Sequence, residues 1–94
     1  MDYWKDGQKH NSDLYSTDEF TLEAMSVLED RYETGETDPF FMYMAYNAPH
    51  HPYEMPSHAL LEEFGNLPTK RKEYLAVLYR MDQMIGRLVD KYVN

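Results

Sequence analysis

Apolar residues recur at helical spacing directly behind a sequence that is typical of a helix start. Ser16-Thr17-Asp18-Glu19 fits a capping box, with Ser16 as the N-cap and Glu19 at the third helical position. The apolar positions that follow recur at helical spacing; they are Phe20, Ala24, Val27, Leu28 and Tyr32. This spacing predicts a helix over about 17–32 that ends before Gly35.

Two further helices are predicted in the second half of the chain. A short one begins at the N-cap Ser57 and ends at Gly65. After Pro68, Thr69 can cap a long helix that reaches about residue 92. The stripe of this helix that should face the core consists of Leu75, Leu78, Asp82, Ile85, Val89 and Tyr92, with Gly86 beside it. We expect Gly86 to permit close approach of a sheet and Asp82 to bond a neighbouring loop.

A short aromatic segment separates these helices. Residues 39–46 (PFFMYMAY) are apolar at both parities, whereas a half-exposed strand alternates with polar residues. The pattern predicts a strand buried on both faces, as in the middle of a parallel sheet. Residues 47–56 hold three prolines and are expected to form a loop. Residues 1–15 lack a clear period and are expected to be an irregular or short-stranded lead-in.

The resulting order is helix, buried strand, loop with short helix, and long helix, which indicates an α/β fold. A strand buried on both faces needs neighbours on both edges, and one strand leaves main-chain groups unpaired. We therefore expect residues 1–94 to be part of a longer α/β domain, with residues 16–94 as its α-β-α segment. Self-association that supplies the missing strands is the alternative.

Composition and charge exclude several functions. The net charge is −8, and residues 1–38 carry all of the excess, with eleven Asp and Glu against three Lys and Arg. Without a basic face, nucleic acid is not an expected partner. No apolar run is long enough to span a membrane. The absence of cysteine excludes disulfides, thiol nucleophiles and thiolate metal sites.

The loop after the predicted strand is where candidate chemistry lies, because α/β proteins bind ligands beyond the carboxyl ends of their strands. It carries Asn47, His50 and His51. Adjacent histidines usually point apart, so a metal site that also used His58 is disfavoured, and we predict no metal ligands here. Taken alone, His50 is more simply a loop histidine held by backbone groups.

Three stretches in register resemble type I (formylglycine-dependent) sulfatases, and together they cover nearly all of residues 13–93. Residues 15–24 look like the Y-S-T-x-x-F-T-x-x-A helix start of that family. Residues 39–52 resemble its P-F-F-L-Y-L-A-x-x-x-x-H-x-P strand and loop. The residues that fit its Y-x(7)-D-x-x-[IV]-G helix are Tyr74, Asp82, Ile85 and Gly86. The branch that looks most similar is the arylsulfatase B-like enzymes.

This resemblance implies an alkaline-phosphatase-like α/β fold and hydrolysis of sulfate esters of sulfated glycans or aryl sulfates. His50 matches the family's active-site histidine, which makes it the expected catalytic and substrate-binding residue, with His51 beside it as a second substrate contact. The resemblance also implies a calcium ion, a formylglycine nucleophile and a lysosomal or secreted location. The chain itself holds neither the C/S-x-P-S-x-R formylglycine motif nor the family's calcium-binding Asp residues.

The expected function is therefore that of a partial sulfatase domain that is inactive alone. The alternative from another class is a non-catalytic, truncated paralogue that binds or regulates a partner through strand pairing of residues 39–46. A phosphohydrolase of the same superfold is a weaker alternative, because its nucleophile would lie outside this chain.

Overall fold

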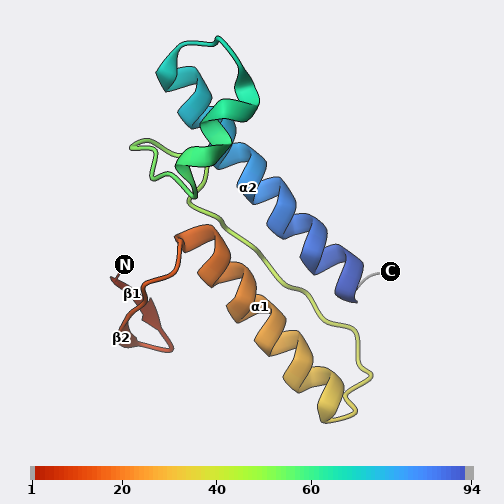
Figure 1. Ribbon diagram of the computed structural model, residues 1–94. Helices are drawn as coiled ribbons and strands as arrows, with labels where there is room; N and C mark the ends of the chain where they lie inside the picture. The colour runs from red at the N-terminus through yellow and green to blue at the C-terminus, as the bar shows by residue number, and fades with distance from the viewer. Residues whose placement is uncertain (1, 93–94) are drawn as a thin grey trace.

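The computed structural model describes residues 2–92, which form a β-hairpin, two long helices and a 3₁₀ helix. Helix α1 spans Ser16–Glu33 and helix α2 spans Thr69–Tyr92. Both helices run in the same direction, and residues 34–57 return between them as an extended chain (Figure 1). None of the helices in this described part is long and apolar enough to cross a membrane.

The core lies where α1 meets α2, and small side chains make up much of it. One face of α1 is buried at positions three or four residues apart, at Thr17, Thr21, Ala24 and Leu28. The residues of α2 that pack there are Ala76, Val77 and Met84. Small residues allow two helices to approach closely, so that main-chain atoms as well as side chains exclude water.

Polar contacts fix the two helices at both ends of this interface. The guanidinium of Arg80 donates two hydrogen bonds to the carboxylate of Asp18, at 2.8 and 2.7 Å. Asp18 raises the pKa of Arg80 through these bonds. Near the other end, the Tyr92 hydroxyl lies 3.1 Å from the Met25 carbonyl oxygen and 3.0 Å from a Glu29 carboxylate oxygen. The inward position predicted for Tyr92 is therefore confirmed.

The predicted helix over 17–32 is confirmed, but its capping box is wrong. Tyr15 is the N-cap residue, and no side chain caps the helix. The carboxylate of Glu19 instead accepts hydrogen bonds from the Tyr3 hydroxyl at 2.7 Å and the Ser12 hydroxyl at 2.8 Å. These bonds lower the pKa of Glu19. The N-terminal residues fold against the start of α1, and their hydroxyl groups bind the Glu19 side chain that the capping box required.

Those N-terminal residues form a hairpin, which is the short-stranded alternative of the expected lead-in rather than the irregular one. Strands β1 (Asp2–Lys5) and β2 (Gln8–Asn11) pair antiparallel. The residues between them, Asp6 and Gly7, have φ of 51° and 77°. A two-residue loop with positive φ at both positions matches the right-handed twist of the strands, and Asp-Gly is a preferred sequence for it. The signal for this hairpin was therefore present in the sequence.

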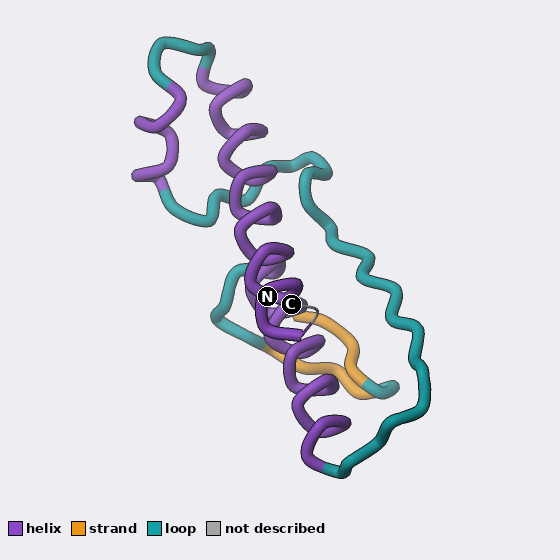
Figure 2. Tube along the Cα trace, turned by 90° about the vertical axis from the view of Figure 1, so that its right-hand side faces the viewer, coloured by secondary structure: helices purple, strands orange, loops and turns teal. Residues whose placement is uncertain are grey.

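The predicted strand over 39–46 is extended but is not part of a sheet. It runs beside the helices without meeting another strand of the described residues (Figures 1 and 2). Met42 and Met44 are half-buried, whereas Phe41 is 89% and Tyr43 is 81% exposed. The expectation of burial on both faces is wrong for this structure. Residues 2–92 cover only one face of the segment and supply no strand at either of its edges.

The buried face of α2 also differs from the predicted stripe. Asp82, Ile85 and Val89 are exposed, because α1 packs against the neighbouring face of the helix. No atom lies within 4 Å of a Cβ built on Gly86, so the described residues place no sheet against it. Asp82 forms no hydrogen bond to a loop in this part of the chain. Helix α2 thus has two apolar faces: α1 covers one, and the 3₁₀ helix covers part of the other, where Phe64 meets Tyr79 with ring centroids 6.2 Å apart.

The remaining helix boundaries follow the sequence closely. The predicted short helix is a 3₁₀ helix, η1 (His58–Phe64), in which the Ser57 hydroxyl oxygen accepts a hydrogen bond from the Ala59 amide at 3.3 Å. Gly65 ends it with a φ of 64°, a conformation that favours glycine. Thr69 is the first residue of α2 rather than its cap, since the Pro68 carbonyl already accepts a bond from the Lys72 amide at 3.0 Å.

Candidate functional site

The loop that follows the extended segment is shaped by a tight turn. The His50 amide donates a hydrogen bond to the Asn47 carbonyl oxygen at 2.9 Å, which closes the turn of residues 47–50. The Ala48-Pro49 and His51-Pro52 peptide bonds are both cis. Proline fixes φ and removes amide donors, so this sequence cannot continue the extended segment. The turn therefore displays His50 and His51 one after the other at the end of the segment.

This loop borders a hollow of about 550 Å³ that opens between the N-terminus of α1 and the middle of α2. Its lining combines the loop with residues from both helices: Tyr15, Ser16, Tyr46, Asn47, Ala48, His50, His51, Pro52, Glu54 and Val77. The two histidines predicted as site residues are brought to the same hollow. The side chain of His58, the third histidine of the disfavoured metal site, lies outside the described part of the structure.

The imidazole of His50 has one nitrogen in use and one free. Its Nδ1 atom forms a close hydrogen bond with the His51 carbonyl oxygen. A carbonyl can only accept, so Nδ1 must carry a proton, and Nε2 is the atom left for a ligand. The His50 side chain is exposed. The backbone contact expected of an ordinary loop histidine is present here. It orients the ring and uses only one of its two nitrogen atoms.

His51 is held by a row of aromatic rings that ties the loop to α2. Its ring meets Tyr53 edge-on with centroids 5.5 Å apart, and Tyr53 meets Tyr74 in the same way at 5.8 Å. The Arg71 guanidinium lies 5.7 Å from the centre of the Tyr74 ring. Edge-to-face pairs of this kind are worth about 0.5–1.5 kcal/mol each beyond their buried area. The loop is thus anchored at its far end by packing.

At its near end the loop is anchored by a hydrogen bond to the core. The hydroxyls of Tyr46 and Thr21 are 2.6 Å apart, and Thr21 also donates to the Thr17 carbonyl oxygen at 2.8 Å. Thr21 has one hydroxyl proton, which this second bond uses, so Tyr46 must be the donor between them. Because Thr21 is fully buried, Tyr46 fixes the end of the extended segment against α1. His50 lies four residues later in the chain, so its position depends on this anchor.

Two tyrosines and one glutamate of the hollow were not predicted from the sequence. Tyr15 lines it from the start of α1, and burial raises the pKa of its phenol, with a smaller contribution from the nearby carboxylate of Glu54. Tyr46 and Glu54 complete the set. No local signal marks Glu54, whereas Tyr15 begins the first stretch quoted above and Tyr46 is the last residue of the predicted strand. These three residues meet at the hollow only because the chain returns between the two helices.

The hollow does not fit a calcium ion. Calcium takes six to eight oxygen ligands, usually with several carboxylates. Glu54 is the one acidic residue in the lining, and no group of three or more His, Cys, Asp or Glu that could hold a metal occurs among the residues that were described. The hollow is therefore a place where an imidazole can meet a ligand.

In open α/β sheets, ligands bind beyond the carboxyl ends of the strands. Here the histidine loop follows an extended segment that lies between two parallel helices and pairs with no other strand of the described residues. Residues 1–92 match the sulfatase family, and the chain belongs to that family. It is 35% identical over 78 residues to the uncharacterized sulfatase YdeN of Escherichia coli (strain K12), a match that covers 82% of this chain and 14% of that relative's length. The chain thus spans a small part of that relative, and no solved structure matches it.

This family assignment implies the alkaline-phosphatase-like α/β fold that the resemblance indicated. Within residues 2–92, the helices and the two-stranded hairpin are the parts of such a fold that the structure displays.

Proposed function

We propose that this chain is part of the catalytic domain of a sulfuric ester hydrolase, in which His50 contacts the sulfate group of the substrate. The observation that supports it most directly is the state of the His50 ring. Its Nδ1 atom is tied to the His51 carbonyl oxygen, and its Nε2 atom is free beside a hollow of about 550 Å³. This arrangement occurs in a chain of the sulfatase family, at the position that resembles the family's active-site histidine.

The proposed role of His50 is electrostatic. When the ring is protonated, Nε2–H can donate a hydrogen bond to a sulfate oxygen or to the ester oxygen that departs with the leaving group. A donor fixed in advance toward developing negative charge stabilises the transition state, and removal of one such donor typically costs about 10²–10³ in rate. His51, on the same hollow, is proposed as a second contact to the substrate.

Other parts of the sulfatase must supply the bond-breaking chemistry in this proposal. The chain has no cysteine and no serine within a C/S-x-P-S-x-R motif, so it holds no precursor of formylglycine. The described residues offer no calcium site either. The segment therefore contributes a sulfate contact and the scaffold that holds it. We expect sulfated glycans or aryl sulfates as substrates and an arylsulfatase B-like branch, while the lysosomal or secreted location rests on the resemblance alone.

A titration of the chain with sulfate esters tests the contact. The probes are p-nitrophenyl sulfate and inorganic sulfate, each compared with chloride at equal ionic strength, and the imidazole signals are followed by NMR. We expect the His50 signals to shift with saturation. His10 provides the matched control, because it lies on the hairpin, where its ring stacks on Tyr3 at 5.8 Å, and outside the hollow.

Two variants make the test specific. His50→Gln should abolish saturable binding of p-nitrophenyl sulfate, whereas His10→Gln should bind it as the unchanged chain does. Equal binding by the two variants would contradict the assignment of His50, even if the chain bound sulfate esters at another place.

A further inference from the structure

The hollow that holds His50 also holds one carboxylate, that of Glu54. Glu54 lies four residues after His50 in the chain, and both line the same space of about 550 Å³. Its side chain is exposed, and no hydrogen bond or ion pair joins it to another of the described residues. Within this part of the chain, the carboxylate of Glu54 is therefore free to meet a ligand.

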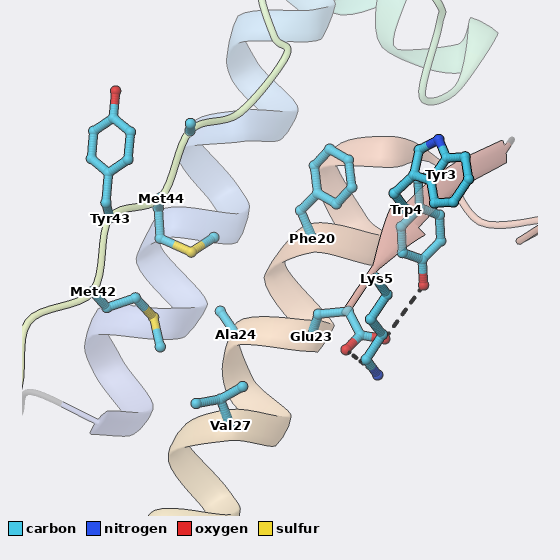
Figure 3. A pocket seen from close by; sticks show the side chains of 11 residues that line it. Tyr3, Trp4, Lys5, Phe20, Glu23, Ala24, Val27, Met42, Tyr43 and Met44 are labelled. Carbon is cyan, nitrogen blue, oxygen red and sulfur yellow. Dashed lines mark hydrogen bonds and ion pairs between the residues drawn. The ribbon is translucent and has the colours of Figure 1, made fainter. Parts of the chain in front are cut away.

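The carboxylate at a second hollow, by contrast, is already paired. This hollow, of about 410 Å³, lies between β1 and the extended segment (Figure 3). Glu23 is the acidic residue of its lining. The Glu23 carboxylate lies 2.7 Å from the Lys5 ammonium and accepts a hydrogen bond from the Tyr3 hydroxyl at 3.5 Å. A nearby opposite charge largely cancels the field of a carboxylate, so Glu23 acts weakly on a ligand, whereas Glu54 keeps its full charge.

The charge on Glu54 acts inside the hollow of His50. Burial raises the pKa of the Tyr15 phenol, and the Glu54 carboxylate raises it further. Tyr15 lines the hollow from the start of α1. A carboxylate that acts on one lining group through space acts in the same way on a charged ligand placed beside that group.

The other groups of this lining leave the charge of Glu54 unopposed, except by the histidines. The polar side chains from Tyr15, Ser16, Tyr46 and Asn47 are uncharged, and no lysine or arginine is among the described residues that line the space. A protonated imidazole attracts an anion, and the carboxylate repels one. The hollow thus combines a group that attracts sulfate with a group that opposes a second negative charge.

We propose that Glu54 is a specificity-determining residue, which selects sulfate esters that carry a hydroxyl or a positively charged group, and no second anionic group, beside the sulfate. A carboxylate accepts hydrogen bonds from hydroxyls and forms charge-assisted bonds with an ammonium. Neighbouring sulfate or carboxylate groups on the substrate are disfavoured. This inference rests on the proposed function, because the sulfate must be held at His50 for Glu54 to discriminate among the groups around it.

The size of the effect follows from Coulomb's law. Two unit charges about 6 Å apart in water change a binding constant about threefold. A positive group is favoured by this factor and a negative group is disfavoured by it. Replacement of an ammonium by a carboxylate at the same place on a ligand should therefore weaken binding about tenfold.

Three phenyl sulfates that differ only in the para substituent test the selection. They are the aminomethyl, hydroxymethyl and carboxymethyl compounds, which are positive, neutral and negative at that position. Each is titrated into the chain at one pH and one ionic strength, and NMR follows the imidazole of His50 and the side-chain carboxyl of Glu54. We expect the aminomethyl compound to bind most tightly and the carboxymethyl compound about tenfold more weakly.

Two matched variants separate Glu54 from the net charge of −8 on the whole chain. Glu54→Gln keeps the shape of the side chain and removes its charge, and should reduce the tenfold spread of affinities to about twofold or less. Glu63→Gln removes the same charge from an exposed residue of η1 that does not line the hollow. The tenfold spread should remain in this control.

Equal affinities of the three compounds for the unchanged chain would overturn the inference, and so would equal spreads in the two variants. In either case, saturable shifts of the His50 signals would leave the sulfate contact in place. If none of the compounds shifted those signals, the sulfate contact itself would be wrong, and the selection by Glu54 would be wrong with it.

Discussion

The bond between Tyr46 and Thr21 gives the sharpest prediction, because it links the core to the loop that carries His50. The two hydroxyls are 2.6 Å apart, and Thr21 is fully buried. Tyr46→Phe keeps the ring and removes the donor, leaving an oxygen of Thr21 without its partner. A neutral hydrogen bond contributes about 0.5–1.5 kcal/mol net, and a buried partner places this one in the upper half of that range. We expect the free energy of unfolding to fall by about 1 kcal/mol.

A double-mutant cycle isolates that contribution. Thr21→Val is nearly isosteric and removes both the acceptor for Tyr46 and the bond to the Thr17 carbonyl. Urea unfolding followed by circular dichroism, for the unchanged chain, each single variant and the pair, gives the coupling energy. A coupling near 1 kcal/mol is expected. Additive effects within about 0.3 kcal/mol would refute the reasoning, because the two hydroxyls would then stabilise the fold independently.

The same substitution has a consequence for the site. Once Tyr46 is released, the turn at residues 47–50 is fixed only by its own bonds and by the aromatic row at His51. Binding of p-nitrophenyl sulfate at His50 should weaken several-fold in Tyr46→Phe, although the hydroxyl is not proposed to contact sulfate. Retained affinity in the destabilised variant would show that the anchor stabilises the fold without orienting the loop.

Four further outcomes are expected. Asp18→Asn should lower the free energy of unfolding by about 1–2 kcal/mol, through loss of the bidentate pair with Arg80 and of a negative charge at the start of α1; high salt should reduce this effect. Hydrogen bonding to Glu19 raises the pKa of Tyr3 to about 12, so its contribution to stability should be lost as pH rises from 10 toward 12, and denaturant melts of Tyr3→Phe should lack that loss. The lowered pKa of Glu19 predicts a loss of stability at the acidic end of the pH range. The contribution of Glu19 to the free energy of unfolding is present above about pH 4.5 and declines as pH falls, and this decline should be absent in Glu19→Gln. Finally, the purified chain should not hydrolyse p-nitrophenyl sulfate with calcium present, since it holds no formylglycine precursor; turnover would contradict the division of roles proposed above.

Local signals were sufficient for the helices. The spacing of apolar residues placed α1, η1 and α2 within one or two residues of their observed ends, because a helix is stabilised by contacts three and four residues apart. Gly65 ended η1 as expected. The hairpin was predictable by the same local logic, since Asp6-Gly7 is a strong turn signal, although the sequence interpretation passed over it.

Features that depend on distant residues were not determined locally. Either of two apolar faces of α2 could have been buried, and α1 selected the one with Ala76 and Met84. The carboxylate of Glu19 could cap its own helix or bind the hairpin, and the fold of the hairpin decided this. Likewise, an apolar segment at 39–46 is extended by its own preference, but a strand exists only where another strand pairs with it.

The sequence by itself determined the helices, the proline loop and the candidate histidines, since each depends on residues that are neighbours along the chain. The tertiary structure alone brought Tyr15, Tyr46 and Glu54 to the same hollow as His50, and tied Tyr46 to Thr21. The physical reason is that a site of this kind is made where segments far apart in the chain meet, and burial and hydrogen-bond partners are fixed only at that meeting.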